Sequence, residues 1–455
     1  MTNIRAIPKS HLADIMGVSL STVEKWEANG TYNSVHENGK TVFPLEQLSN
    51  IAEIKAMLES NWDEELTTLP RRDFTSVELF AGAGGLALGL EMAGFKHVLL
   101  NEFNSAACST LRHNRPKWNV IEKDVHNLSF LPLRGKVDFL SGGFPCQAFS
   151  YAGQKGGFND TRGTLFFELA RAVKEIQPKV FLGENVKGLS SHDNGRTLNT
   201  IRNVISELGY TLVDPHVLKA IMYQVPQKRE RLFLVAIRND IANLVSFSWP
   251  SPYYRIMTLR DAFFCGELYD SDVPDSDGAK YPEKKRIVLE MVPEGGDWRD
   301  LPVDVQKDYM GGSFLLGGGK TGMARRLSMD EPSLTLTCSP AQKQTERCHP
   351  FETRPLTIRE YARIQTFPDQ WEFQGSLSEQ YKQIGNAVPV NLAFAMGRSL
   401  MRLMNDIDRV FPENVDIKEV DDIVRKQLSG HHYGYDIFGN VCVVAEPDGM
   451  EIKNK

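Results

Sequence analysis

Between residues 73 and 250 the chain alternates short apolar segments with helical ones, and this alternation constrains the fold more than any other feature. The predicted strands are residues 76–80, 97–101, 137–141, 179–183 and 231–237. Helical periodicity separates them, for example at residues 162–175 and 196–208. Strand–helix alternation predicts an α/β fold with a doubly wound, Rossmann-like sheet, whose ligand site lies at the carboxyl ends of the strands.

A length of 455 residues exceeds one ordinary domain, and the pattern changes on both sides of this sheet. After residue 250 the alternation stops, glycine and proline cluster, and a smaller, irregular, β-rich domain is expected. Helical periodicity returns at residues 357–364 and 391–404. The predicted divisions are an N-terminal module (1–66), the main sheet (73–250), the irregular domain (251–350), a return segment (351–410) and a mildly acidic tail (411–455).

The N-terminal module has the pattern of two short helices joined by a turn. Residues 11–16 and 21–28 are helical in period, and Gly17 lies between them. A strand at residues 41–43 and a helix at residues 45–58 follow, so the module resembles a MerR-like winged helix-turn-helix. Its five basic and ten acidic residues do not suit a phosphate-binding surface. An accessory or dimerisation module and an operator-reading module therefore both remain open.

Composition restricts where nucleic acid could bind and where the protein works. The net charge is −6, so any nucleic-acid role must rest on a local basic surface, such as residues 320–359 with seven basic and four acidic residues. The six cysteines are scattered without a CxxC pair, which indicates reduced thiols and no metal site. The N-terminus lacks a secretory pattern and no apolar run approaches the ~18 residues of a membrane span. A soluble cytoplasmic protein is expected.

A glycine-rich turn, FAGAGG (80–85), directly follows the first predicted strand and precedes a helical pattern at residues 86–92. Glycines at such a turn let the backbone approach a nucleoside-bearing ligand. Alone, the turn fits tight packing as well as nucleotide binding. Glu102 closes the next strand, where a ribose-hydroxyl acceptor would fall, and Asp124 follows a third extended stretch, where it could accept from an adenine amine. Together these residues favour an adenosyl ligand.

A cysteine and a carboxylic acid follow two further strands. Cys146 lies in GGFPCQ after the strand at 137–141, and Glu184 ends the next strand, 38 residues later. Because neighbouring strand ends lie about 5 Å apart, a thiol and a carboxyl group could share one pocket. In QKRER (227–231) strand alternation points Gln227, Arg229 and Arg231 to one face. A thiol, an acid and guanidinium groups suit addition to an electron-poor ring.

These residues resemble a known family, the DNA (cytosine-5) methyltransferases of bacterial restriction–modification systems. The matching blocks are FAGAGG (80–85), GGFPCQAFS (142–150), RGTLFFELAR (162–171), ENVKGL (184–189), VPQKRERLF (225–233), RPLTIREYARIQTFPD (354–369) and YKQIGNAVPVNL (381–392). They occur in order across residues 73–405, so the N-terminal module and the tail lie outside the resemblance. The resemblance implies methyl transfer from S-adenosyl-L-methionine to C5 of cytosine in a specific short duplex sequence.

The resemblance also implies roles for individual residues. Cys146 would be the nucleophile, Glu184 the acid at the cytosine ring, Arg231 the partner of its O2, and Arg229 a support of Glu184. The implied cofactor-binding residues are Phe80, Gly82, Gly84, Gly85, Glu102, Asp124, Pro145, Leu165, Asn386 and Ala387. Because C6 of a stacked cytosine is covered, the base must be flipped out, and residues 147–163 would form a loop that closes on DNA.

Target recognition is assigned by the resemblance to residues 251–350, which carry a characteristic Thr-Leu pair. The implied DNA-binding residues are Gln147, Ser150, Thr335, Leu336, Lys343 and Arg347. The expected partners are duplex DNA, which a monomer would bind, and a cognate restriction endonuclease as the other half of the system. Two alternatives stay open: methylation of tRNA cytosine, and a second role of the N-terminal module as an autoregulatory DNA-binding unit.

Overall fold

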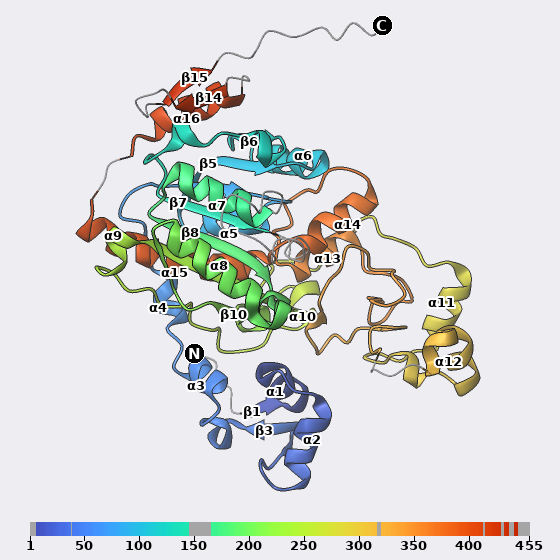
Figure 1. The fold of residues 1–455 in the computed structure, drawn as a ribbon. Coiled ribbons are helices and arrows are strands. Elements are labelled where there is room, and N and C mark those ends of the chain that lie inside the picture. The colour runs from blue at the N-terminus through green and yellow to red at the C-terminus, as the bar shows by residue number, and fades with distance from the viewer. Residues whose placement is uncertain are drawn as a thin grey trace, which may run out of the picture.

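The structure is a computed structural model, and it describes residues 6–37, 39–144, 165–315, 320–412, 415–428, 432–435 and 441–444. Its centre is a sheet of eight described strands in the order β10-β12-β8-β7-β4-β5-β6, with β9 added against β12 (Figure 1). The strands are β4 (Phe74–Leu79), β5 (Phe95–Glu102), β6 (Val120–Glu122), β7 (Phe139–Gly143), β8 (Val180–Val186), β9 (Tyr210–Leu212), β10 (His216–Lys219) and β12 (Glu230–Arg238). β4 to β8 pair in parallel, whereas β12 runs antiparallel to β8. The predicted α/β sheet is confirmed.

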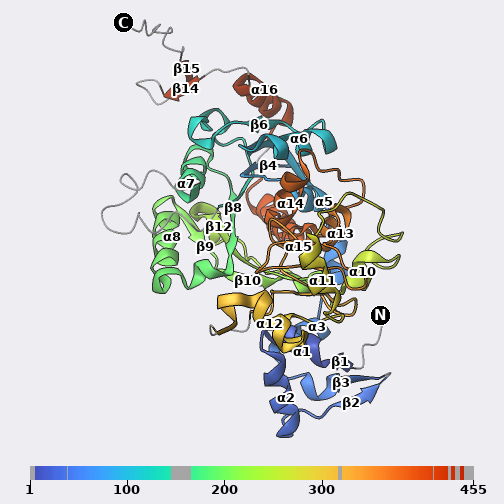
Figure 2. The same cartoon turned by 90° about the vertical axis from the view of Figure 1, so that its right-hand side faces the viewer.

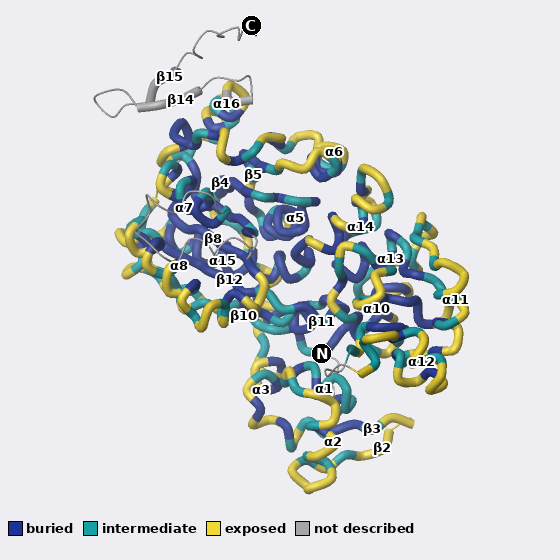
Figure 3. Tube along the Cα trace, turned by 45° about the vertical axis from the view of Figure 1, so that its right-hand side comes forward, coloured by how far each residue is buried: buried dark blue, intermediate teal, exposed yellow. Residues whose placement is uncertain are grey.

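Helices cover both faces of this sheet, and alternate residues of each strand point to opposite faces. On one face Phe139, Val180 and Phe233 belong to a core shared with α5 and α15. On the other face Leu140 and Phe181 pack with α7 and α8. The helices around the sheet are α5 (Gly85–Met92), α6 (Ser105–Asn114), α7 (Leu165–Ile176), α8 (Arg196–Glu207), α9 (Asn239–Ala242) and α15 (Val390–Val410). Figure 3 shows the central strands of the sheet, together with α5 and α15, as buried.

The N-terminal segment, residues 6–66, combines short helices with a three-stranded sheet in the order β1-β3-β2. Its elements are β1 (Ala6–Pro8), α1 (Lys9–Met16), α2 (Leu20–Ala28), β2 (Val35–Glu37), β3 (Lys40–Pro44), α3 (Ala52–Leu58) and α4 (Trp62–Leu66). Gly17 ends α1 in a left-handed conformation with φ of 69°, and the Ser19 side chain caps α2 by accepting from the N–H of Thr22. The single helix expected at residues 45–58 is wrong, because a 3-10 turn over Leu45–Leu48 and extended backbone at Ile51 precede α3.

Residues 251–350, called the recognition segment because the resemblance assigns target recognition to them, correct a second expectation. The described part of this segment is not β-rich: it contains α10 (Leu259–Phe263), α11 (Glu283–Glu290), α12 (Val303–Met310) and only the two-residue strand β13 (Ser333–Leu334), which pairs with β11 (Gln227–Lys228). The prolines of this segment suggested that no helix runs through it. Pro282 and Pro302 are instead the N-cap residues of α11 and α12. Proline is tolerated there because the first N–H groups of a helix have no intrahelical partner.

The chain then returns to the sheet through α13 (Ile358–Ile364), α14 (Leu377–Asn386) and α15. Beyond it, α16 (Ile417–Leu428) packs Val420 and Val424 into the core face of α7, and a hairpin of β14 (His432–Tyr435) and β15 (Val441–Val444) follows. Figures 1 and 2 place α16 and the N-terminal segment at opposite ends of the molecule. Within the described residues, no helix combines the length and apolar character needed to cross a membrane.

Candidate active site

The glycine-rich turn joins β4 to α5 at the carboxyl edge of the sheet. Phe80 adopts a positive φ of 59° and Gly84 a φ of 87°, so the backbone reverses sharply before the helix begins at Gly85. A Cβ on Gly85 would collide with the carbonyl oxygen of Val388, which brings the return segment directly against the turn. Gly84 faces the other way, toward Leu111 and Trp371, so its role is close packing.

A cavity of about 970 Å³ opens beside this turn. It is lined by eleven of the residues singled out from the sequence, namely Phe80, Gly82, Gly85, Glu102, Glu184, Arg229, Arg231, Thr335, Leu336, Asn386 and Ala387. They come from the sheet, the recognition segment and the return segment. The sequence therefore identified residues on each of these parts of the wall, whereas four of its candidates, Pro145, Cys146, Gln147 and Ser150, lie outside the described residues together with the whole of 147–163.

Glu102 is fixed at the end of β5 by backbone donors. Its Oε2 accepts from the N–H of Gly82 at 2.8 Å, and its Oε1 accepts from Phe103 and Asn104 at 2.9 and 2.8 Å. The carboxylate thus joins the glycine-rich turn to the next strand and faces the cavity with a set orientation. The neighbouring Phe103 side chain is 73% exposed, an unusual state for phenylalanine.

Two predicted cofactor residues lie away from the described cavity wall. Asp124 caps a 3-10 turn by accepting from the backbone and ring of His126 at 3.0 and 2.7 Å, and these bonds lower the pKa of its carboxyl. Leu165 begins α7 and packs against the core beneath it.

Glu184 lies near the end of β8, opposite Gly143 of β7 in the parallel register. Its Oε1 forms an ion pair with Nε of Arg231 at 2.7 Å, and both side chains are about nine-tenths buried, with 11% and 12% exposed. Burial raises the pKa of Glu184, whereas the nearby guanidinium groups of Arg231 and Arg229 oppose that rise. The site therefore contains a desolvated carboxyl group held in place by one arginine.

Arg229 lies near Glu184 and also binds two backbone carbonyl groups. Its guanidinium donates to the carbonyl oxygens of Leu336 and Gly385 at 3.3 and 3.0 Å, and burial lowers its pKa to about 9. Its positive charge acts on Glu184 through space. Arg229 therefore joins the recognition segment to the return segment behind the cavity wall.

The Thr-Leu pair lies at the cavity, but the two predicted cations near it do not. Thr335 is exposed and Leu336 is buried, and both line the cavity. Arg347 is 4% exposed, and its guanidinium donates to the carbonyl oxygens of Thr335 and Glu346 at 2.6 and 2.7 Å. Lys343 is exposed, with its ammonium 4.9 Å from the centre of the Tyr309 ring. In this arrangement Arg347 supports Thr335 from inside the protein.

Sequence reasoning missed several polar residues of the site, two of which lie buried on the strands of the sheet. Glu78 is 1% exposed, lines the cavity beneath the glycine-rich turn, and accepts from Ser141 Oγ at 3.3 Å; burial raises the pKa of Glu78 to about 8. Asn185 donates from Nδ2 to the carbonyl oxygen of Phe144 at 2.7 Å, which holds the end of the strand that leads to residue 146. The available sequence signals were Glu78, a charged residue within an apolar strand, and Asn185, an amide next to Glu184.

Comparisons with known proteins agree with this geometry. Residues 74–402 match the family described as C-5 cytosine-specific DNA methylase. The chain is 63% identical over 402 residues to the Type II methyltransferase M.Eco47II of Escherichia coli, covering 88% of this chain and 96% of that protein. It is 59% identical over 399 residues to the Type II methyltransferase M.PspPI of Psychrobacter sp. (strain TA137), covering 87% and 95%. Among solved structures it is similar to a DNA modification methyltransferase encoded within an E. coli prophage, with a TM-score of 0.54 and 25% identity over 73% of this chain and 100% of that one.

Proposed function

The chain belongs to the C-5 cytosine-specific DNA methylase family, and on that premise we propose how its residues perform the reaction. It is a DNA (cytosine-5) methyltransferase that uses S-adenosyl-L-methionine as methyl donor. Since its relatives are Type II methyltransferases, its role is the modification half of a restriction–modification system, with a restriction endonuclease as the other half. The observation that carries the assignment is the Glu184–Arg231 pair in the same cavity as the glycine-rich turn.

The residues around the turn fit an adenosyl cofactor. The cavity of about 970 Å³ has room for it, and Gly82 of the turn lines the cavity without a side chain. Glu102, held by three N–H donors, would accept from the ribose hydroxyls, and Phe80 and Phe103 would flank the adenine. Asn386 and Ala387 would complete the wall. When bound, the cofactor supplies the methyl group. Asp124, Pro145 and Leu165 remain proposed cofactor contacts. Asp124 and Leu165 do not line the described cavity, and Pro145 lies outside the described residues.

The protein's own groups prepare the cytosine. The Cys146 thiolate would add to C6, which makes C5 nucleophilic toward the methyl group. Glu184, whose pKa is raised by burial, would donate to ring N3 as charge moves onto the ring, and Arg231 would hold both Glu184 and the cytosine O2. Loss of the C5 proton and release of the thiolate would then give 5-methylcytosine.

DNA would approach the mouth of this cavity, and the target base would be flipped into it. Thr335 is exposed at the rim, and Gln147 and Ser150 would contact DNA from the segment after Cys146. Lys343 would contact the phosphate backbone, and Arg347 would keep Thr335 in position from below. The expected binding unit is a monomer.

We propose that the N-terminal segment is a winged helix-turn-helix, and its element order supports this. Three residues separate α1 from α2, and β2 and β3 form a hairpin beside them. A second role in autoregulation rests on this layout alone, and it is tested by binding of the whole chain to a fragment of its own promoter that lacks the methylation target.

The test is methyl transfer itself. Purified protein with tritiated S-adenosyl-L-methionine should label plasmid DNA and not tRNA, with the label in 5-methylcytosine after hydrolysis. An oligonucleotide with 5-fluorocytosine at the target should form a denaturation-resistant conjugate through Cys146, and Cys146→Ser should abolish both signals while cofactor binding persists. Labelling of tRNA alone, or turnover by Cys146→Ser, would contradict the proposal.

A further inference from the structure

Several polar contacts of the N-terminal segment reach β10, β11 and the residues just before β13, which carries the chain to the Thr335–Leu336 pair. These contacts are Asp14 to Lys228 at 2.8 Å, Lys219 to the carbonyl oxygen of Ile15 at 2.5 Å, Lys219 to Glu53 at 3.4 Å, Lys40 to Asp330 at 2.7 Å and His11 to the carbonyl oxygen of Asp330 at 3.2 Å. Asp330 precedes β13, and Lys228 lies in β11, which pairs with β13. The segment is thus attached at the base of the recognition segment.

Lys228 forms ion pairs with both the N-terminal segment and the recognition segment. Its ammonium lies 2.8 Å from Asp14 and 3.3 Å from Glu331, with 29% of the lysine side chain and 15% of the Asp14 side chain exposed. Burial raises the pKa of Asp14, and the Lys228 ammonium opposes that rise. Removing either partner would leave a desolvated group of the other sign, which is costly.

The backbone and neighbours of Lys228 hold the cavity wall. Thr335 Oγ1 donates to the carbonyl oxygen of Lys228 at 2.5 Å, and the N–H of Leu336 donates to Oε1 of Gln227 at 3.0 Å. On the other side, Arg229 donates to the carbonyl oxygens of Leu336 and Gly385. Residues 227–229 therefore fasten the Thr-Leu pair, and the middle one of the three reaches back to the N-terminal segment.

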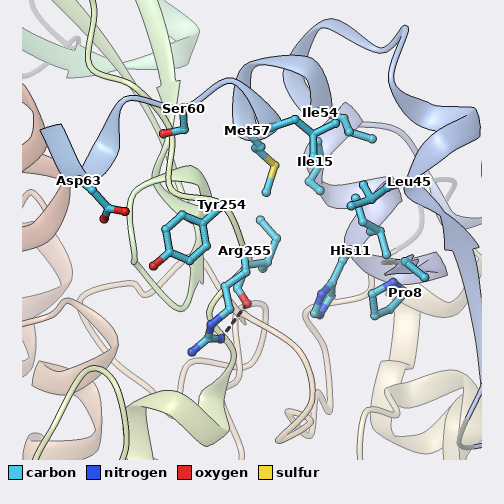
Figure 4. Close-up of a pocket in the computed structure, with 14 residues that line it drawn as sticks. Pro8, His11, Ile15, Leu45, Ile54, Met57, Ser60, Asp63, Tyr254 and Arg255 are labelled. Carbon is cyan, nitrogen blue, oxygen red and sulfur yellow. Dashed lines mark hydrogen bonds between the residues drawn. The ribbon is translucent and has the colours of Figure 1, made fainter. Parts of the chain in front are cut away.

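Apolar packing does not by itself fix the segment against the recognition segment. Two cavities, each of about 440 Å³, lie at this junction and share Pro8 and His11 in their walls. Figure 4 shows one of them, with Pro8, His11 and other residues of the N-terminal segment facing Tyr254 and Arg255. Ile15 and Ile54 share a buried cluster with Met257, but close packing is interrupted beside His11, so the ion pairs contribute to how the segment is held there.

We propose that the N-terminal segment is a brace for methyl transfer, in which Asp14 and Lys228 are positioning residues for the Thr335–Leu336 wall of the cavity. This rests on the proposed function of that cavity. The brace acts on the geometry of the pocket that receives the target base, and it requires no DNA contact by the segment itself. Its acidic charge, which does not suit phosphate binding, is compatible with this role.

The test compares Asp14→Asn and Lys228→Gln with the wild type on duplex DNA. Both should lower kcat by about tenfold to a hundredfold, because small displacements of a pocket wall misplace the reacting base. The affinity for S-adenosyl-L-methionine should change by less than about threefold, since Glu102 and the glycine-rich turn that would bind it are not held by this pair. Asp14→Glu, which keeps the carboxylate, should recover most of kcat. The double variant should be no slower than the slower single variant, because both changes break one contact.

The matched control is Lys40→Gln, which breaks an ion pair of the same interface whose side chains are 56% and 47% exposed. It should keep wild-type kcat. If Asp14→Asn fails to fold, Lys228→Gln examines the same pair from its more exposed partner. Wild-type kcat in folded Asp14→Asn and Lys228→Gln, even with a lowered Tm, would overturn the brace and leave the proposed function intact. Absence of DNA methylation by the wild type would instead overturn the proposed function.

Discussion

At the scale of single residues, the site depends on carboxyl groups that the fold keeps out of water. Glu184 has one short ion pair, yet burial dominates and raises its pKa. A carboxyl group whose pKa is raised in the folded state makes its full contribution to stability at pH values below the pKa of the unfolded state. That contribution is lost as the pH rises through the pKa of the folded state. The same property is useful in catalysis, because a carboxyl group with a raised pKa holds its proton more readily and can donate it to the cytosine ring.

Glu78 gives the sharper pH prediction, because burial raises its pKa from 4.5 to about 8. The wild type should lose stability as pH rises from about 4.5 to about 8, by an amount on the order of 4 kcal/mol if Glu78 acted alone. Glu78→Gln, which resembles the protonated form, should flatten that part of the profile. Urea unfolding at a series of pH values measures it. Glu230→Gln, at a side chain that is 33% exposed, is the control and should follow the wild type. An equally steep profile in Glu78→Gln would show that another group causes the loss.

At the scale of secondary-structure elements, the register of β7 against β8 creates the space for the Glu184 carboxyl. Gly143 lies opposite Glu184, and a Cβ on Gly143 would be 2.9 Å from Oε2 of Glu184. A real Cβ cannot stay at that distance, so the carboxyl would have to move away from its position beside Arg231. The glycine is therefore required by the neighbouring strand's side chain and not by its own backbone conformation.

Gly143→Ala should accordingly reduce kcat by about tenfold or more, with a change in unfolding free energy of only about 1 kcal/mol. Single-turnover methylation and urea unfolding of the same preparation separate the two effects. Gly142→Ala is the matched control, since its Cβ would meet a terminal methyl carbon of Leu169 that can shift. If both alanine variants have the same kcat, the register argument for Glu184 fails.

The element scale also shows what could be predicted from sequence. Apolar strands flanked by turns identified β4, β5, β7, β8 and β12, and residue order along them placed Glu102 and Glu184 at one edge. The short helices α11 and α12 were missed, because proline at a helix cap and proline in a loop have the same appearance in sequence. Arg347 was expected to contact DNA because it lies in a basic stretch, yet its guanidinium donates to backbone carbonyl groups. The direction of a side chain depends on tertiary packing, which the sequence pattern does not show.

At the scale of the whole molecule, segments far apart in sequence share one core. The buried apolar cluster that contains Ile15 and Ile54 of the N-terminal segment continues through Met222 and Met257 to α15. At the other end of the molecule, α16 adds Val420 to the core, and Asn119 donates to Asp421 at 3.1 Å. Neither end behaves as a separate appendage in packing, although sequence patterns alone divided the chain there.

Glu65 of α4 tests this continuity, because it joins three distant segments. It is 2% exposed, accepts from the backbone N–H of Ser251, and pairs with Arg402 of α15 at 3.0 Å. Arg398 lies 3.9 Å away and is 2% exposed. Glu65→Gln would leave the Arg398 charge without its counter-charge, so the loss in unfolding free energy should be about 3–5 kcal/mol.

If the molecule unfolds as one unit, calorimetry of Glu65→Gln should show a single transition moved to lower temperature, and hydrogen exchange should rise in both α1 and α15. Glu64→Gln, an exposed neighbour, should leave the transition in place. A new early transition that exposes only residues of the N-terminal segment would mean that the segment unfolds alone. A brace that unfolds independently could still act, but Glu65 would then connect two units that fold separately and not one continuous core.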